Sequence, residues 1–174
     1  MQTCIVYSSR TGNTRAVGTY LADCFGLPIF AVENAPLGFE RFILGFWTWR
    51  GGPDEAMRLF MGRLCRKNVF FFGTMAAFPD SPHAERCALR TEELLSRGNC
   101  RVLGHFFCQG RLDPEVLARS THPRTPERMA RLAEAAGHPN VQDFRAAEAA
   151  VRKAFAMDVS CGAAPSGTFL KQSA

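Results

Sequence analysis

The chain lacks any apolar run approaching the roughly 20 residues needed to cross a bilayer. Its first residues lead directly into a strand pattern, without a basic segment followed by an apolar signal core. We therefore expect a soluble, cytoplasmic protein with no membrane insertion. With 174 residues and 47% hydrophobic content, the chain is long enough to bury one core without disulfides or a metal.

Paired cysteines are also absent. No two of the seven form a C-x-x-C pair, and most lie in apolar stretches, where a thiol packs as a small core residue. This pattern disfavours a disulfide scaffold and a zinc site, so we predict no metal. An odd, scattered set of thiols is typical of a reducing compartment. The cysteines are Cys4, Cys24, Cys65, Cys87, Cys100, Cys108 and Cys161.

The sequence has no recognisable hydrolase arrangement. No Ser-His-Asp, Cys-His or paired-carboxylate set can be defended, and we assign no catalytic residue. The histidines are scattered, and His105, which falls in a predicted strand, is expected to be a core residue. The four are His83, His105, His122 and His138.

The chain is basic, with a formal net charge of +5. Its basic residues are spread over the predicted helices rather than clustered, so we expect no nucleic-acid partner. A basic surface would steer acidic partners or anionic ligands toward the protein.

Short apolar runs alternate with helical patterns. Strands are predicted over residues 3–7, 29–32, 42–46, 69–72 and 102–108, and each is followed by a helical pattern. Parallel neighbours need crossover connections, so this alternation predicts an α/β fold with a parallel sheet between two layers of helices. Weaker helices are expected over 114–119 and 126–136. We predict one domain over residues 1–157 and a mobile tail over 158–174.

Four helices carry apolar stripes at the spacing of a helix that lies on a sheet. The predicted inward-facing residues are Val17, Tyr20, Leu21 and Cys24; Met57, Phe60, Met61 and Leu64; Ala84, Cys87, Ala88, Thr91 and Leu95; and Phe144, Ala147, Val151 and Phe155. Pro53 and Pro82 are expected in the first turns of the second and third of these helices.

The loop after the first strand has the chemistry that a phosphate monoester needs. Its hydroxyls and an Asn amide can donate hydrogen bonds, Gly12 permits a close turn, and the following helix directs its positive end to the same place. The competing interpretation is a plain turn in which Thr11 or Asn13 caps the helix. A Walker loop is excluded by the missing G-K-[ST] ending, and the dinucleotide fingerprint by the missing glycines. The predicted phosphate-binding residues are Ser9, Arg10, Thr11, Gly12, Asn13 and Thr14.

This loop resembles the flavodoxin hallmark T/S-x-T-G-N-T, and the resemblance extends over most of the chain. It implies a flavodoxin-like three-layer sandwich with a five-stranded sheet of order 2-1-3-4-5. It also implies FMN bound without a covalent link, with the ring between the loops after the third and fourth strands. His138-Pro139 is similar to a short flavodoxin-like subgroup that includes the proteins accompanying bilirubin reductases.

The resemblance assigns the flavin ring to two loops. Trp47 and Trp49 are the only two tryptophans, and we expect at least one to contact the ring. Gly51 and Gly52 would permit a backbone flip near flavin N5, or simply precede a helix. Residues 109–111 are further candidates. The predicted contacts are Trp47, Thr48, Trp49, Arg50, Gly51 and Gly52 in the first loop, and Gly73, Thr74, Met75 and Phe78 in the second.

Two departures from the family bear on function. The second loop lacks the Tyr and acidic residues that flavodoxins usually place there. Arg10 and Arg50 put positive charge near the ring, which would favour the anionic reduced flavin and raise its potential.

We therefore expect an electron-transfer protein that shuttles electrons between a reductase and a redox enzyme, with the cofactor supplying the chemistry. The alternative is an FMN-dependent NAD(P)H oxidoreductase that acts on a small acceptor such as a quinone or tetrapyrrole. A third reading, a module without redox function, is disfavoured by the intact phosphate loop.

Overall fold

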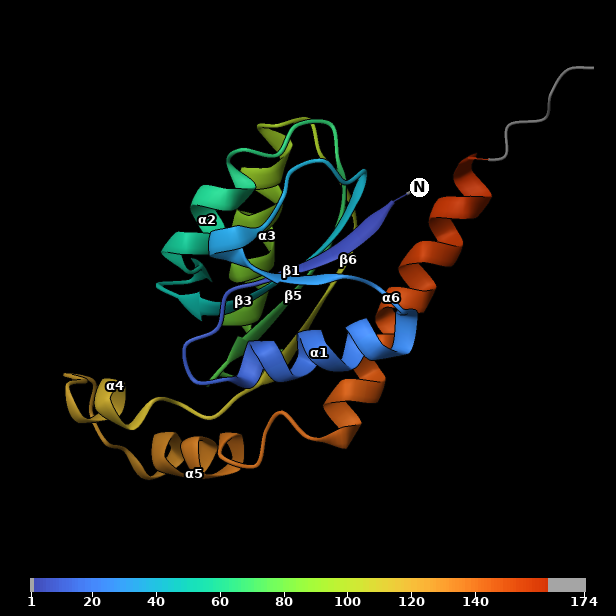
Figure 1. Ribbon diagram of the computed structural model, residues 1–174. Coiled ribbons are helices and arrows are strands. Elements are labelled where there is room, and N and C mark those ends of the chain that lie inside the picture. Colours follow the sequence, from blue (N-terminus) through green and yellow to red (C-terminus); the bar gives the residue numbers. More distant parts are fainter. Residues whose placement is uncertain (1, 163–174) are drawn as a thin grey trace, which may run out of the picture.

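The computed structural model describes the backbone of residues 2–162 and the side chains of residues 2–156. Five parallel strands form one twisted sheet in the order β2-β1-β3-β5-β6 (Figure 1). The strands are β1 (Thr3–Tyr7), β2 (Ile29–Ala31), β3 (Arg41–Trp49), β5 (Asn68–Met75) and β6 (Arg101–Gln109). The two-residue strand β4 (Gly52–Pro53) pairs with β3 in the antiparallel sense. The predicted parallel sheet of order 2-1-3-4-5 is confirmed for the five longer strands.

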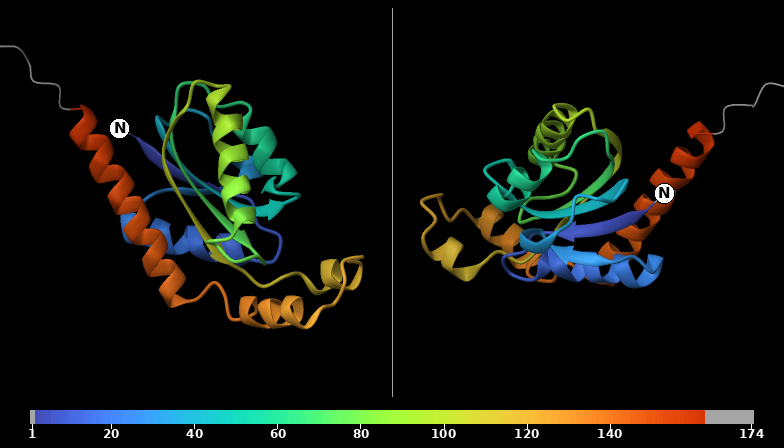
Figure 2. Two further views of the ribbon diagram at one scale, coloured as in Figure 1. Left: turned by 180° about the vertical axis from the view of Figure 1, so that it is seen from behind. Right: turned by 45° about the horizontal axis from the view of Figure 1, so that its top comes forward.

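Helices cover both faces of the sheet. Figure 2 shows α1 and α6 on one face and α2 and α3 on the other. The helices are α1 (Asn13–Phe25), α2 (Glu55–Met61), α3 (Pro82–Ser96), α4 (Pro114–Ala118), α5 (Pro126–Ala135) and α6 (Val141–Gly162), with a 3-10 turn η1 at Val32–Asn34. The predicted three-layer α/β sandwich is confirmed.

The central strands β1, β3 and β5 are buried on both faces, which explains their continuous apolar runs. Successive side chains of a strand point to opposite faces, so Phe42 and Leu44 pack with α2 and α3 while Ile43 packs with α1 and α6. The predicted inner faces of the second and third helices are all buried. In α1, however, Cys24 is exposed, because the stripe turns toward Gly18 and Ala22, which are buried in its place.

Two strands are longer than the sequence indicates. β3 and β5 continue in parallel register to the pair Trp47 and Thr74, and β3 then turns back into β4. Trp47, Thr48 and Trp49 therefore belong to a strand and not to a loop. Pro53 lies in β4 rather than in a first helical turn, since Asp54 is the residue that caps α2.

His105 is not a core residue. It lies on β6, an edge strand, where its side chain is 40% exposed. Its ring stacks on Phe71 with centroids 5.2 Å apart, and its Nδ1 is 3.4 Å from a carboxylate oxygen of Glu92. The edge position explains the error, because no further strand covers that side.

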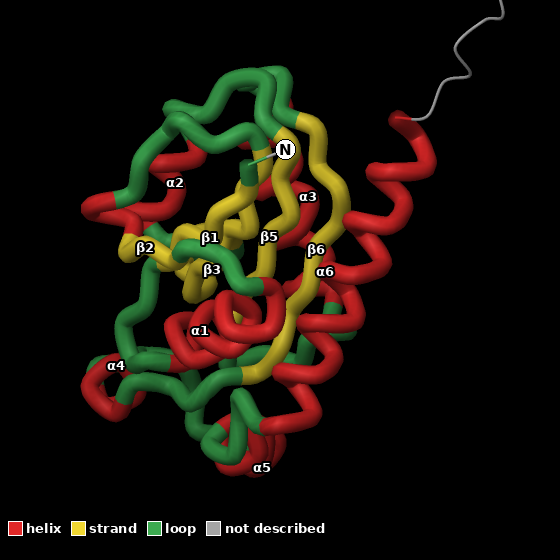
Figure 3. The backbone as a smooth tube through the Cα atoms, turned by 45° about the vertical axis from the view of Figure 1, so that its right-hand side comes forward, coloured by secondary structure: helices red, strands yellow, loops and turns green. Residues whose placement is uncertain are grey.

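Residues 110–140 form an excursion between β6 and α6 that carries the short helices α4 and α5 (Figure 3). Both weaker helical predictions, over 114–119 and 126–136, are confirmed to within one residue. Helix α6 extends to Gly162, past Phe155, the last residue of its predicted apolar stripe, and residues 163–174 of the predicted tail lie outside the described residues. Over residues 2–162, no helix has the length and hydropathy to cross a membrane.

Candidate functional site

The loop between β1 and α1 presents unused hydrogen-bond donors. Gly12 has φ of 90°, a left-handed conformation that favours glycine, and no side chain caps the start of α1. Within the described residues, none of the backbone N–H groups of residues 9–15 donates to a protein acceptor. The Ser9 hydroxyl is buried and also lacks a partner. The structure thus disfavours the plain-turn interpretation, in which Thr11 or Asn13 would cap the helix.

Two buried hydrogen bonds hold this loop from below. The Ser8 hydroxyl donates to Oδ1 of Asp54, the cap of α2, over 2.7 Å. The hydroxyls of Thr14 and Thr74 are 2.9 Å apart. The loop after β1 is therefore tied to the start of α2 and to the end of β5, which keeps its free N–H groups in a defined place.

Burial raises the pKa of the Asp54 carboxyl, and the hydrogen bonds from Ser8 and from the backbone of α2 lower it in part. The residue is 2% exposed, and its second oxygen, Oδ2, has no hydrogen-bond partner. Ionising the Asp54 carboxyl beneath the loop therefore costs desolvation free energy.

The aromatic side of the site comes from the end of β3. The rings of Trp47 and Trp49 lie 5.5 Å apart, and Trp49 is 43% exposed. The guanidinium of Arg10 lies over the Trp47 ring at 5.9 Å and that of Arg50 over the Trp49 ring at 5.6 Å. Residues that alternate on one strand share a face, so the two indoles, inclined at 55°, lie on the same side of β3, and we call them the aromatic wall.

A tight hairpin joins β3 to β4. Both central residues have positive φ, 50° at Arg50 and 78° at Gly51, as in the two-residue turns that match the twist of a hairpin. Arg90 of α3 donates to the carbonyl oxygens of both residues, over 2.9 and 3.2 Å. These carbonyls therefore face α3, which opposes the backbone flip considered for Gly51 and Gly52.

The excursion of residues 110–140 closes one side of the site. Nε of Arg10 lies 2.7 Å from Oδ2 of Asp113, and Nδ2 of Asn13 donates to the carbonyl oxygen of Arg111 over 2.8 Å. The backbone N–H of Glu115 and the Arg10 guanidinium lower the pKa of Asp113. Asn13 thus holds the excursion with the side chain that was expected to donate to a phosphate.

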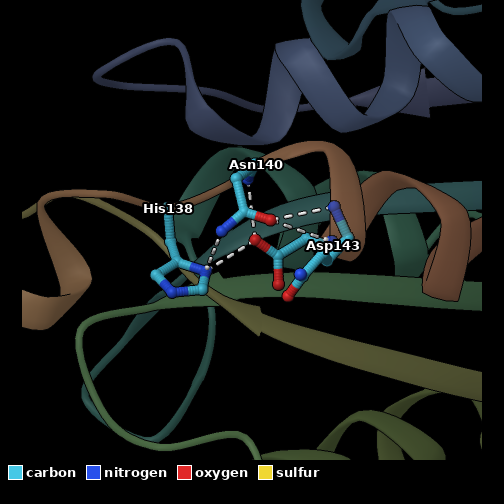
Figure 4. A network of polar contacts seen from close by, with 4 residues as sticks. His138, Asn140 and Asp143 are labelled. Carbon is cyan, nitrogen blue, oxygen red and sulfur yellow. Dashed lines mark hydrogen bonds and ion pairs between the residues drawn. The ribbon is translucent and has the colours of Figure 1, made fainter.

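The far end of the excursion is held by a local network (Figure 4). Nδ1 of His138 lies 2.6 Å from Oδ2 of Asp143, and the same oxygen accepts from the backbone N–H of Asn140 over 2.7 Å. The carbonyl oxygen of His138 in turn accepts from the backbone N–H of Arg111. The His138-Pro139 dipeptide therefore closes the excursion and lies outside the pocket lining.

Between the loop, the aromatic wall and the excursion lies a pocket of about 710 Å³. The predicted site residues that line it are Arg10, Thr11, Asn13, Trp47, Thr48, Trp49, Thr74, Met75 and Phe78. Ser9 and Gly12 line a neighbouring polar hollow of about 300 Å³. Of the weaker candidates, Gly110 and Arg111 line the main pocket and Gln109 does not.

The remaining predicted residues lie elsewhere. Thr14 is buried beneath the pocket, and Gly73 is covered by the ring of Phe107, which a Cβ would approach to 2.4 Å. Arg50, Gly51 and Gly52 belong to the hairpin that α3 holds. These residues miss the pocket because β3 and β5 are longer than predicted. Gly73 lies within β5, and Arg50, Gly51 and Gly52 lie in the hairpin beyond the end of β3.

Several pocket residues were missed, because local patterns predict the short helices but not where they pack. They come from the start of α3 and from the excursion: Ser81, Pro82, His83, Arg86, Leu112, Asp113, Val116, Ser120, His122, Arg128, Arg131 and Leu132. Together they make the pocket strongly basic. Burial and the neighbouring Arg86, Arg131 and Arg90 lower the pKa of His83.

Comparison with known proteins agrees with this architecture. A family model described as a flavodoxin domain matches residues 4–152. Two relatives named flavodoxin-like domain-containing protein BilS, from Clostridioides difficile and Clostridium symbiosum, are 24% and 27% identical; each match covers 68% of this chain and 72% or 73% of the relative. The oxidised Flavodoxin 2 structure from Bacillus cereus has a TM-score of 0.55 at 18% identity, covering 91% of this chain and 99% of that one. The expected resemblance to a flavodoxin-like subgroup agrees with the two BilS relatives. The chain belongs to the flavodoxin family.

Proposed function

We propose that the protein binds FMN, with the phosphate at residues 9–14 and the ring against the aromatic wall, and that it transfers electrons between a reductase and a redox enzyme. The observation that carries this proposal is the set of free N–H groups in residues 9–15 beside the unpartnered Ser9 hydroxyl. Converging amides at a helix start are suited to a dianion, and no lysine is needed.

The residues present fit the cofactor. A buried hydroxyl without a partner costs free energy unless a ligand or water satisfies it, so Ser9 is suited to a phosphate oxygen. The hydroxyl of Thr11 and the guanidinium of Arg10 line the adjoining pocket. Either Trp47 or Trp49, whose ring planes are inclined at 55°, offers a flat apolar face on which an isoalloxazine ring could stack. When bound, FMN would accept and return one or two electrons.

The chain's own residues would then set the conditions of transfer. The aromatic wall and Phe78 exclude water from one side of the ring, while Trp49 and Phe78, 43% and 39% exposed, leave an apolar edge for a partner. Basic side chains on the pocket lining would favour a negatively charged ligand there and, with FMN bound, would raise its potential relative to that of an acidic flavodoxin. This charge favours an acidic docking partner.

The alternative, an NAD(P)H oxidoreductase that reduces a quinone or a tetrapyrrole, is favoured by one observation. The excursion extends the pocket beyond the aromatic wall to α5, which leaves lining that the flavin ring alone would not need.

A titration with FMN and with riboflavin, which lacks the phosphate, tests the cofactor and its orientation. Charged hydrogen bonds are worth about 1.5–3 kcal/mol each, so FMN should bind at least about tenfold more tightly than riboflavin. Equal affinities would refute the phosphate placement. Mixing the FMN-loaded protein with NADPH then separates the two functions, because bleaching of the flavin without an added reductase would exclude a simple carrier.

A further inference from the structure

The part of the pocket that α3 and α5 line concentrates positive charge. His83 and Arg86 reach it from the first two turns of α3, and Arg128 and Arg131 reach it from α5. The loop of residues 9–14, where the FMN phosphate is proposed, contributes Arg10, Thr11 and Asn13 to the pocket lining, while its Ser9 and Gly12 line the separate hollow of about 300 Å³, which none of these four basic residues lines. These basic residues are therefore not required for that phosphate.

Among the side chains of residues 2–156, no carboxylate pairs with these arginines. Asp113 is the only carboxylate among the residues that line the pocket, and it is bound to Arg10. Within residues 2–156, Arg86 and Arg131 make no ion pair. Arg128 donates to the carbonyl oxygen of His122, to that of Pro123 and to the Ser120 hydroxyl, none of which carries a charge.

Arg131 gives the most specific indication of a ligand. Its Nε is buried and has no hydrogen-bond partner. A buried donor on a charged group is costly when it is left unsatisfied, so an acceptor is expected there. His83 faces the same arginines, and its lowered pKa keeps the ring neutral near pH 7, which leaves the arginines as the charged groups.

The walls around these charges are apolar. Ala77 and Phe78 come from the loop after β5, and Val116 and Leu132 come from the excursion. A ligand that fits both features has an apolar body and an acidic group.

We infer that this arginine-lined part of the pocket is a subsite for the oxyanion, a carboxylate or a phosphate, of a second ligand with an apolar body, bound beside the flavin. Its position beside a flavin rests on the proposed function, whereas the subsite itself rests only on the arginines and their surroundings. The subsite would give the protein a small acidic substrate or donor of its own.

Calorimetric titration of the full chain, with and without FMN, tests the subsite. The probes are 2-naphthoate, its neutral amide 2-naphthamide, and NADP+ and inorganic phosphate as phosphate sources. We expect 2-naphthoate or NADP+ to bind at least about tenfold more tightly than 2-naphthamide, because a charge-assisted pair replaces a neutral contact. Tighter binding of naphthoate identifies a carboxylate site, and tighter binding of NADP+ or phosphate identifies a phosphate site.

The variants Arg131→Gln and Arg86→Gln should each reduce this preference about tenfold, while Arg63→Gln, at an exposed arginine outside the pocket lining, should leave it unchanged. Since Arg86 is exposed and lies on a different helix from Arg131, it tests the idea even if Arg131→Gln perturbs α5. Equal binding of 2-naphthoate and 2-naphthamide, together with no tighter binding of NADP+ or phosphate, would overturn the proposal. So would an Arg131→Gln variant that loses as much FMN affinity as naphthoate affinity. Failure of FMN to bind, with naphthoate still preferred, would refute the proposed function alone.

Discussion

Nδ2 of Asn13 donates a 2.8 Å hydrogen bond to the carbonyl oxygen of Arg111, joining the start of α1 to the beginning of the excursion. Gly110 allows this approach, because a Cβ there would lie 2.7 Å from the Asn13 nitrogen. Asn13, which belongs to the flavodoxin hallmark, thus also positions the excursion that closes one side of the pocket.

Replacing Asn13 by alanine should loosen the excursion. One net hydrogen bond is worth about 0.5–1.5 kcal/mol, so amide hydrogen exchange over residues 111–140 should accelerate by up to about tenfold. Asn34→Ala, at an exposed asparagine in η1, is the matched control and should change nothing there. Unchanged exchange in Asn13→Ala would show that Arg10 and Asp113 hold the excursion without it.

Ser9→Ala should weaken FMN binding by about tenfold or more while leaving riboflavin affinity nearly unchanged, because only the phosphate would contact the buried hydroxyl. Isothermal titration of both ligands measures the difference. Thr19→Ala, on the exposed side of α1, serves as the control. An equal loss for both ligands would mean that Ser9 acts on the fold and not on a phosphate.

The two tryptophans allow a spectroscopic prediction. With Trp49→Phe, the only indole left is Trp47, which is half-buried beside Thr74 at the pocket, and FMN should quench its fluorescence strongly. Trp47→Phe should cost more FMN affinity than Trp49→Phe, since Trp49 is 43% exposed at the hairpin. A larger loss for Trp49→Phe would reverse the assignment of the stacking residue.

Gly45→Ala should destabilise the fold by about 1–3 kcal/mol, because overpacking of a filled core costs that much. An added Cβ would lie 2.2 Å from the Phe72 ring, which is fully buried. Gly62→Ala is the comparison, since its Cβ would meet nothing closer than 3.6 Å and its φ of −63° suits alanine. Urea unfolding of both variants measures the difference, and equal midpoints would contradict the packing described here.

Asp54→Asn should change the pH dependence of stability. Burial raises the pKa of Asp54 in the folded protein, so the folded state binds the proton more tightly than the unfolded state. This contribution favours folding below the unfolded pKa of 3.8 and is lost as pH rises through the raised folded value. The stability of Asp54→Asn relative to the parent chain should therefore increase between pH 4 and pH 7.

Urea midpoints at several pH values measure this change. Asp80→Asn, at an exposed position, should show no such trend. If the stability of Asp54→Asn relative to the parent chain did not change with pH, burial would not raise the pKa of the Asp54 carboxyl.

Much of the architecture was predictable from local patterns. The apolar runs around Ile5 and Phe71 and the stripe that begins at Ala84 reflect burial on known faces, which period and length reveal without tertiary information. The loop of residues 9–14 was recognisable for the same reason, because its donors are contiguous in the sequence. Predictions were wrong where the position of a neighbouring strand determines burial or strand length. His105 is exposed because β6 is an edge strand, and β3 extends to Trp49 instead of ending before it.

The sequence by itself determined the parallel sheet, the two helical layers and the donor-rich turn after β1, because each depends on residues close together in the chain. Only the tertiary structure decided that Asn13 and Arg10 hold the excursion, that Arg90 holds the hairpin, and that Arg86 and Arg131 share one pocket. These contacts join residues far apart in the sequence, and no periodicity records which distant side chains packing will bring together.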